Sequence, residues 1–157
     1  MVGQNRFMDM ALTEAAEAAS LGEIPVGAVV VDGTSGSVLS RSGNRTRTDT
    51  DPSAHAEMLA IRAACAAVGA ERLSGCDLYV TLEPCAMCAA AISFARIRRL
   101  YYGASDPKSG GVEAGARVFS HPQCHHVPEI YAGIGEAESA RLLREFFAAR
   151  RPDPAPG

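Results

Sequence analysis

Two short motifs constrain the fold of this chain more than any other feature of its sequence. The first is His55-Ala56-Glu57 and the second is Pro84-Cys85-Ala86-Met87-Cys88. A zinc ion prefers four tetrahedral ligands of nitrogen or sulfur type, and a catalytic zinc keeps one position for water. Two cysteines three residues apart at a helix N-terminus can reach one ion, and the helix dipole there favours their thiolate forms. We therefore expect a fold that brings two helix starts to one zinc ion, held by His55, Cys85 and Cys88.

The glutamate of the first motif predicts the chemistry. Zinc lowers the pKa of a bound water to roughly 7, so hydroxide is available at neutral pH. Glu57 lies two residues beyond His55, close enough to face that water without ligating the ion. It would take the proton of the water, deliver it to a ring nitrogen of the substrate, and help the departing amine leave as ammonia. The motifs together indicate an enzyme that activates water on zinc, with Glu57 as its catalytic residue.

Each motif has a plainer interpretation when it is taken alone. Cys85 and Cys88 could be a redox pair, but no thioredoxin-like context surrounds them and a separate His-x-Glu motif is present. A structural zinc site would need a fourth protein ligand. The candidates for it are Cys76, Cys124, His121, His125 and His126. A glutamate beside the histidine ligand has no purpose in such a site, so the catalytic interpretation is favoured.

Composition and charge indicate the cellular compartment and the kinds of partner that the protein has. The chain has five cysteines, an odd number, and its N-terminal segment carries Asp9, Glu14 and Glu17 where a secretory signal would be uncharged. We therefore expect reduced thiols and a cytoplasmic location, and no stretch approaches the roughly 18 apolar residues of a membrane span. The net charge of −3 is not that of a general nucleic-acid binder. Clustered arginines could contact phosphate locally or simply form a solvated face.

The remaining sequence divides into helical and extended segments. Helical spacing and capping residues predict helices over 6–21, 51–68, 83–96 and 135–151. In the second of these, Asp51 is the expected N-cap and Pro52 the first helical residue. Apolar runs predict strands over 26–31, 37–41, 77–82 and 98–103, the first two forming a hairpin. We expect one α/β domain over residues 1–151 and a disordered tail over 152–157.

The two motifs match the signature of zinc-dependent cytidine and adenosine deaminases. Over nearly its whole length the chain resembles bacterial tRNA-specific adenosine deaminases, including the stretches 24–29, 43–45, 51–57, 78–85, 95–99, 102–110 and 145–151. The resemblance implies a three-layer α/β/α cytidine-deaminase-like fold, with a five-stranded mixed sheet flanked by helices. It further implies one zinc ion per subunit, no organic cofactor, no membrane association and a homodimer. The implied reaction converts adenosine to inosine at the wobble position of the tRNA anticodon, so the anticodon loop of tRNA is the expected partner.

The resemblance also implies which residues bind the substrate. They are Asn44, Asp106, Phe146, Phe147, Val26 and Ala56. Asn44 would hydrogen-bond the flipped base or its ribose, and Asp106 would contact a sugar hydroxyl. Both could instead be ordinary turn residues. The two phenylalanines would form a wall on which an anticodon base stacks, but each follows a leucine by four residues and could pack in the core. We expect one of them in the core and the other toward the substrate.

Two other functions remain open on the sequence alone. A deaminase of a free base or nucleoside, such as guanine, cytosine or cytidine, would carry the same zinc motif. The loop 106–108 and the C-terminal segment 146–151 favour RNA over these small substrates. A non-catalytic RNA-binding or scaffolding subunit would lack the catalytic carboxylate, whereas Glu57 is present. The apolar segment 86–95, with its small residues, is the expected site of dimer contact.

Overall fold

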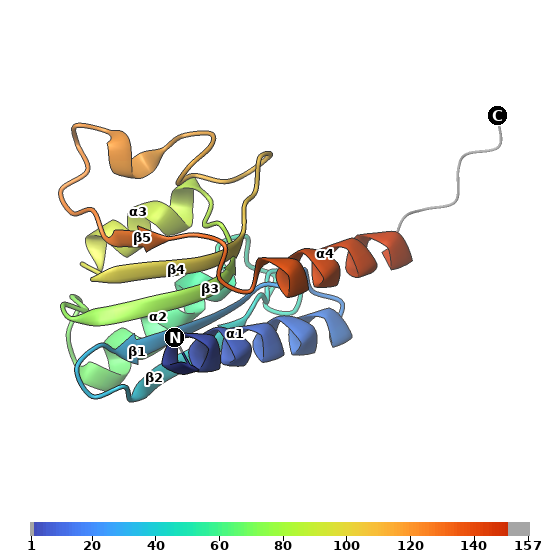
Figure 1. Ribbon diagram of the computed structural model, residues 1–157, viewed down its shortest axis with the longest axis horizontal. Coiled ribbons are helices and arrows are strands. Elements are labelled where there is room, and N and C mark those ends of the chain that lie inside the picture. The colour runs from blue at the N-terminus through green and yellow to red at the C-terminus, as the bar shows by residue number, and fades with distance from the viewer. Residues whose placement is uncertain (1, 151–157) are drawn as a thin grey trace.

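The computed structural model describes residues 2–150. The tail expected over 152–157 lies outside the described residues. Within them the chain forms one mixed sheet with helices on both faces (Figure 1). Of the helices described, none combines the length and the apolar character that a membrane span needs.

Five strands build the sheet in the order β2-β1-β3-β4-β5. They are β1 (Gly27–Asp32), β2 (Val38–Gly43), β3 (Cys76–Leu82), β4 (Arg99–Ala104) and β5 (Glu129–Tyr131). β1 pairs antiparallel with both β2 and β3, whereas β3–β4 and β4–β5 are parallel. The expected hairpin and the mixed five-stranded sheet are confirmed. Sequence patterns did not reveal β5, because its three residues are all exposed and show no alternation.

The helices form the two outer layers of the fold. α1 (Val2–Ser20) and α4 (Glu136–Arg150) cover one face, while α2 (Ala56–Val68) and α3 (Ala86–Phe94) cover the other (Figure 1). Strand residues alternate between the two cores. Leu78 and Val80 pack toward α2 and α3, whereas Tyr79 packs in the cluster that holds Met8 of α1. The three-layer α/β/α architecture is therefore confirmed.

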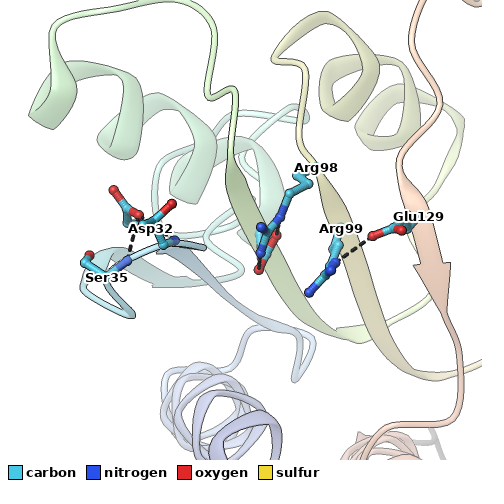
Figure 2. Close-up of polar contacts among 7 residues, drawn as sticks. Asp32, Ser35, Arg98, Arg99 and Glu129 are labelled. Carbon is cyan, nitrogen blue, oxygen red and sulfur yellow. Dashed lines mark hydrogen bonds and ion pairs between the residues drawn. The ribbon is translucent and has the colours of Figure 1, made fainter.

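Polar contacts fix the end of the sheet at which β3 and β4 begin (Figure 2). The Arg98 guanidinium donates two hydrogen bonds to the Asp77 carboxylate, at 3.0 and 2.8 Å. Arg99 pairs with Glu129 at 2.6 Å and so ties the exposed strand β5 to β4. The opposite, C-terminal ends of β3 and β4 are the usual place for a ligand site in sheets with parallel strands.

Two helices begin later than the sequence predicts. The expectation that Asp51 caps α2 is wrong, because its carboxylate accepts hydrogen bonds from the Ser53 amide and hydroxyl and closes a local turn. α2 starts at Ala56, with His55 as its N-cap. α3 likewise starts at Ala86 rather than near 83, and Cys85 is its N-cap. The consequence is that both motifs stand at the first residues of their helices.

Candidate active site

The two helix starts bring the three expected metal ligands together. His55 and Cys85 are N-cap residues with extended backbones, and Cys88 lies one turn into α3. The His55 Nδ1 atom lies 3.6 Å from Cys85 Sγ and 3.5 Å from Cys88 Sγ. Tetrahedral zinc with ordinary Zn–N and Zn–S bond lengths would separate such ligands by about 3.6 Å. The donor set and its spacing therefore fit one zinc ion.

No fourth protein ligand joins this group among the described residues. Cys76 stands at the first residue of β3, whereas the ligands lie beyond the end of that strand. Cys124 contacts the Ser93 hydroxyl instead, and the His126 ring contacts the Ile97 carbonyl. A three-ligand site leaves a coordination position for water, which favours the catalytic interpretation over the structural one.

The electrostatics of the two thiols suit metal binding. A hydrogen bond from the Cys88 thiol lowers the pKa of Cys85 to about 4, against the effect of burial. The same hydrogen bond and burial raise the pKa of Cys88, because its proton is held between the two sulfurs. The lowered pKa favours the thiolate form of Cys85, and a cation bound at this point would replace the proton shared by the two sulfurs.

Glu57 lies beside the ligands on the second residue of α2. Its side chain is only 4% exposed. Burial raises its pKa to about 7, since the ionised form loses its hydration. A carboxyl group with a pKa close to neutral can both accept and release a proton, which is what general acid–base catalysis requires.

A cavity of about 610 Å³ opens above these residues. His55, Glu57 and Cys85 line it, so two of the candidate metal ligands and the Glu57 carboxyl group face the same space. The volume lies within the range of small-molecule sites and suits one nucleoside-sized ligand. The strand ends, the loop after β4 and the last helix together form its wall.

Four of the six expected substrate-binding residues line this cavity, namely Val26, Asn44, Asp106 and Phe147. Ala56 does not line it and lies fully buried in the core beneath α2. One oxygen of Asp106 accepts hydrogen bonds from the Lys108 and Ser109 amides, so this residue also closes an ordinary turn.

The two phenylalanines take different environments. Phe147 is 51% exposed and lines the cavity together with Leu143. Phe146 is buried, meets Phe147 edge to face, and lies under the Arg150 guanidinium at 3.9 Å from its ring centre. The structure therefore points Phe147 toward the cavity and Phe146 into the protein.

Seven residues that line the cavity were not predicted as site residues, namely Ile24, Leu82, Glu83, Ser105, Lys108, Ser109 and Leu143. Glu83 was expected to start a helix, but its buried carboxylate accepts backbone hydrogen bonds from the loop after β4. Burial alone would raise the pKa of Glu83, whereas these hydrogen bonds lower it below its ordinary value. The nearby pair Gly110-Gly111 was the available signal, because adjacent glycines permit close approach of two backbones.

Comparison with known proteins agrees with this geometry. Residues 1–104 match the family model of the cytidine and deoxycytidylate deaminase zinc-binding region. The chain is 60% identical to a tRNA-specific adenosine deaminase of Agrobacterium fabrum, over 98% of this chain and 99% of that protein. Among solved structures, one from a study of A-to-I editing by tRNA:A34 deaminases at the wobble position superposes with a TM-score of 0.85. It shares 62% identity and covers 88% of this chain and 99% of its own. A guanine deaminase structure from Bacillus subtilis gives a TM-score of 0.62 at 33% identity, over 97% of this chain and 96% of its own.

Proposed function

This chain belongs to the cytidine and deoxycytidylate deaminase family, and we propose that it converts adenosine to inosine at the wobble position of tRNA anticodons. The net reaction consumes one water and releases one ammonia. The observation that carries the proposal is the buried Glu57 beside a three-ligand zinc site, at the base of a nucleoside-sized cavity. The 60% identity to a tRNA-specific adenosine deaminase extends over nearly the whole chain and supports this substrate.

Each step of the reaction needs a residue that moves or holds a proton. His55, Cys85 and Cys88 would hold a zinc ion, which would supply Lewis-acid activation of the attacking water. Glu57 accepts the proton of that water and delivers it to the ring nitrogen next to the attacked carbon. Glu57 then takes the second proton, from the new hydroxyl group on the attacked carbon, and passes it to the amine, so that the C–N bond breaks, ammonia leaves and the carbonyl forms. Burial keeps bulk water away from this carboxyl group, so proton transfer is confined to the substrate and the attacking water.

The cavity wall supplies the contacts for the base and its neighbours. Asn44 is buried at the cavity edge, where its amide can hydrogen-bond the base or its ribose. Asp106 stands in the loop after β4 and lines the cavity, where its carboxylate would contact a sugar hydroxyl. Phe147 presents an exposed ring beside the cavity, and splayed RNA bases stack on such rings. The anticodon loop is the RNA element that offers an unstacked adenosine together with its neighbours.

A homodimer in the cytoplasm completes the proposal. Phe94, at the end of α3, is 74% exposed, and Met87 adds further apolar surface to the same helix. Exposed aromatic surface of this kind is typical of a protein interface, and the small residues between allow close helix approach. Five free thiols and a tRNA substrate suit a reducing compartment. Residues 1–151 would act as one deaminase domain. The dimer is tested by light scattering at micromolar protein concentration, where a monomeric mass would refute it.

A free-base deaminase is the second candidate function. The guanine deaminase structure supports it, since that protein shares 33% identity and nearly the full length of the chain. The same zinc site and glutamate would serve either substrate. The two candidates differ in whether the surface around the cavity has to hold RNA.

One assay separates the two candidates. Zinc-loaded protein is incubated with unmodified tRNA that carries a wobble adenosine, and in parallel with free adenosine, adenine, guanine, cytosine and cytidine. Inosine formed only in the tRNA arm supports the proposed function. Turnover of a free base alone would retain the zinc chemistry and replace the substrate.

A further inference from the structure

One buried carboxylate, which the deamination chemistry does not use, accepts four hydrogen bonds from the loop after β4. Glu83 joins the end of β3 to the start of α3, and its side chain is only 3% exposed. Its Oε1 atom accepts a hydrogen bond from the Asp106 amide at 2.9 Å. Its Oε2 atom accepts hydrogen bonds from the amides of Val112, Glu113 and Ala114, at 3.1, 2.9 and 3.3 Å. All four donors belong to one loop, so one side chain anchors that loop at both ends.

Glycines allow the loop to approach the metal-binding segment this closely. A Cβ atom on Gly110 would lie 2.5 Å from the Glu83 carboxylate, and one on Gly111 would lie 2.6 Å from the Ala86 nitrogen. The Gly111 amide donates a hydrogen bond to the Pro84 carbonyl at 2.8 Å. The loop therefore rests directly on the backbone that carries the cysteine ligands.

The same loop forms part of the cavity wall. Asp106, Lys108 and Ser109 all line the cavity. The Asp106 carboxylate in turn accepts hydrogen bonds from the amides of the other two, at 3.2 and 3.0 Å. A chain of contacts thus runs from Glu83 through the Asp106 amide and carboxylate to Lys108 and Ser109, and all three loop residues line the cavity.

We propose that Glu83 is a positioning residue for substrate binding, which fixes the Asp106 end of this loop and so the cavity wall. The inference rests on the proposed function for the identity of the substrate. Glu83 acts through the loop and takes no part in proton transfer. Its loss therefore weakens substrate binding more than it slows the chemical step.

The substitution Glu83→Gln tests this at the level of single hydrogen bonds. Glutamine has the same shape but one acceptor oxygen, and its amide nitrogen only donates. The oxygen can serve the three clustered amides of 112–114. The side-chain nitrogen of the glutamine then faces the Asp106 amide. Both groups are hydrogen-bond donors, so the Asp106 amide loses its acceptor. The variant releases the Asp106 end of the loop and leaves the other end anchored.

Two readouts on the full-length zinc-loaded protein decide the matter. Residue-resolved amide hydrogen exchange should show Asp106 exchanging about ten-fold faster in Glu83→Gln, with 112–114 close to wild type. That difference corresponds to about 1.4 kcal/mol. KM for tRNA should rise by a similar factor, while kcat stays within about three-fold and zinc remains at one ion per subunit. Glu83→Ala, which frees all four amides, should speed exchange at both ends of the loop.

Asp77→Asn is the matched control, because it removes a buried carboxylate that pairs with Arg98 at the other end of the sheet. It should lower the melting temperature with no change in KM or in loop exchange. Wild-type exchange at Asp106 in Glu83→Gln overturns the proposal, and so does a fall in stability with unchanged KM, or loss of zinc. Hydrogen exchange needs no substrate, so it is unaffected if the tRNA assignment fails. If the wild type deaminates a free base instead, KM is compared on that base, and an unchanged value overturns the positioning role.

Discussion

Replacing Glu57 with glutamine is the most direct test of the mechanism. The side chain is buried, and glutamine has nearly its volume, so the core beneath α2 keeps its packing. The three ligand atoms lie on other residues and stay in place. The variant therefore loses the ability to accept and release a proton while it keeps fold and metal.

The expected loss can be worked from this environment. General acid–base catalysis typically contributes about 10²–10⁴-fold, or about 2.7–5.4 kcal/mol of barrier. Because Glu57 is almost wholly shielded from solvent, buffer molecules cannot easily replace it. We therefore expect kcat to fall by about 10⁴-fold, with KM for tRNA changed by less than about three-fold.

The assay combines single-turnover inosine formation with metal analysis of the same preparation. Zinc at one ion per subunit and an unchanged melting temperature would show that only the proton transfer is lost. Glu57→Asp serves as the companion variant, because it keeps the carboxyl group but withdraws it by one methylene. A zinc-loaded Glu57→Gln protein with activity within ten-fold of wild type would refute the assigned role.

Four further outcomes follow from the structure. Cys88→Ala should lose both bound zinc and stability, and removing zinc from the wild type with a chelator should have the same effect. The expected loss is about 4 kcal/mol when free zinc stands at about 1,000 times its Kd. Normal metal content in Cys88→Ala would contradict this prediction. Phe147→Ala should raise KM for tRNA about ten-fold with little change in melting temperature, whereas Phe146→Ala should cost about 3 kcal/mol of stability. Glu23 accepts hydrogen bonds from a neighbouring loop that lower its pKa despite burial, so its contribution holds above about pH 4.5 and is lost as pH falls through the folded-state pKa. Acid titration of unfolding should show a smaller loss in Glu23→Gln, which is itself about 2 kcal/mol less stable at pH 7. Gly27→Ala would place a Cβ atom 1.9 Å from a backbone oxygen of α1, so thermal unfolding should show a loss of about 3 kcal/mol.

The metal centre could be predicted from the sequence because its chemistry depends on residue type and local spacing. His55, Cys85 and Cys88 are strong zinc ligands, and a Cys-x-x-Cys pair at a helix start brings both sulfurs to one side by helical geometry alone. The four buried or half-buried strands could be predicted for a similar reason. Runs of apolar and β-branched residues favour buried strands, as Val29, Val30 and Val31 do in β1.

The sequence alone did not locate the start of α2 or the strand β5. Asp51 followed by proline is a common helix start, yet here its carboxylate closes a turn with Ser53. That outcome depends on competition between two local hydrogen-bond patterns, which the residue types do not settle. β5 exists because the sheet edge and the Arg99–Glu129 pair hold three exposed residues in place.

Neighbours along the chain were enough to predict the three candidate metal ligands and the alternation of helices with strands, and to propose Glu57 as the proton-transfer group. Only the tertiary structure decided that Phe147 rather than Phe146 faces the cavity, and that Glu83 anchors the loop of Asp106. Both depend on segments far apart in sequence that meet in space. A side chain's burial and its hydrogen-bond partners are properties of that meeting, and no local pattern records them.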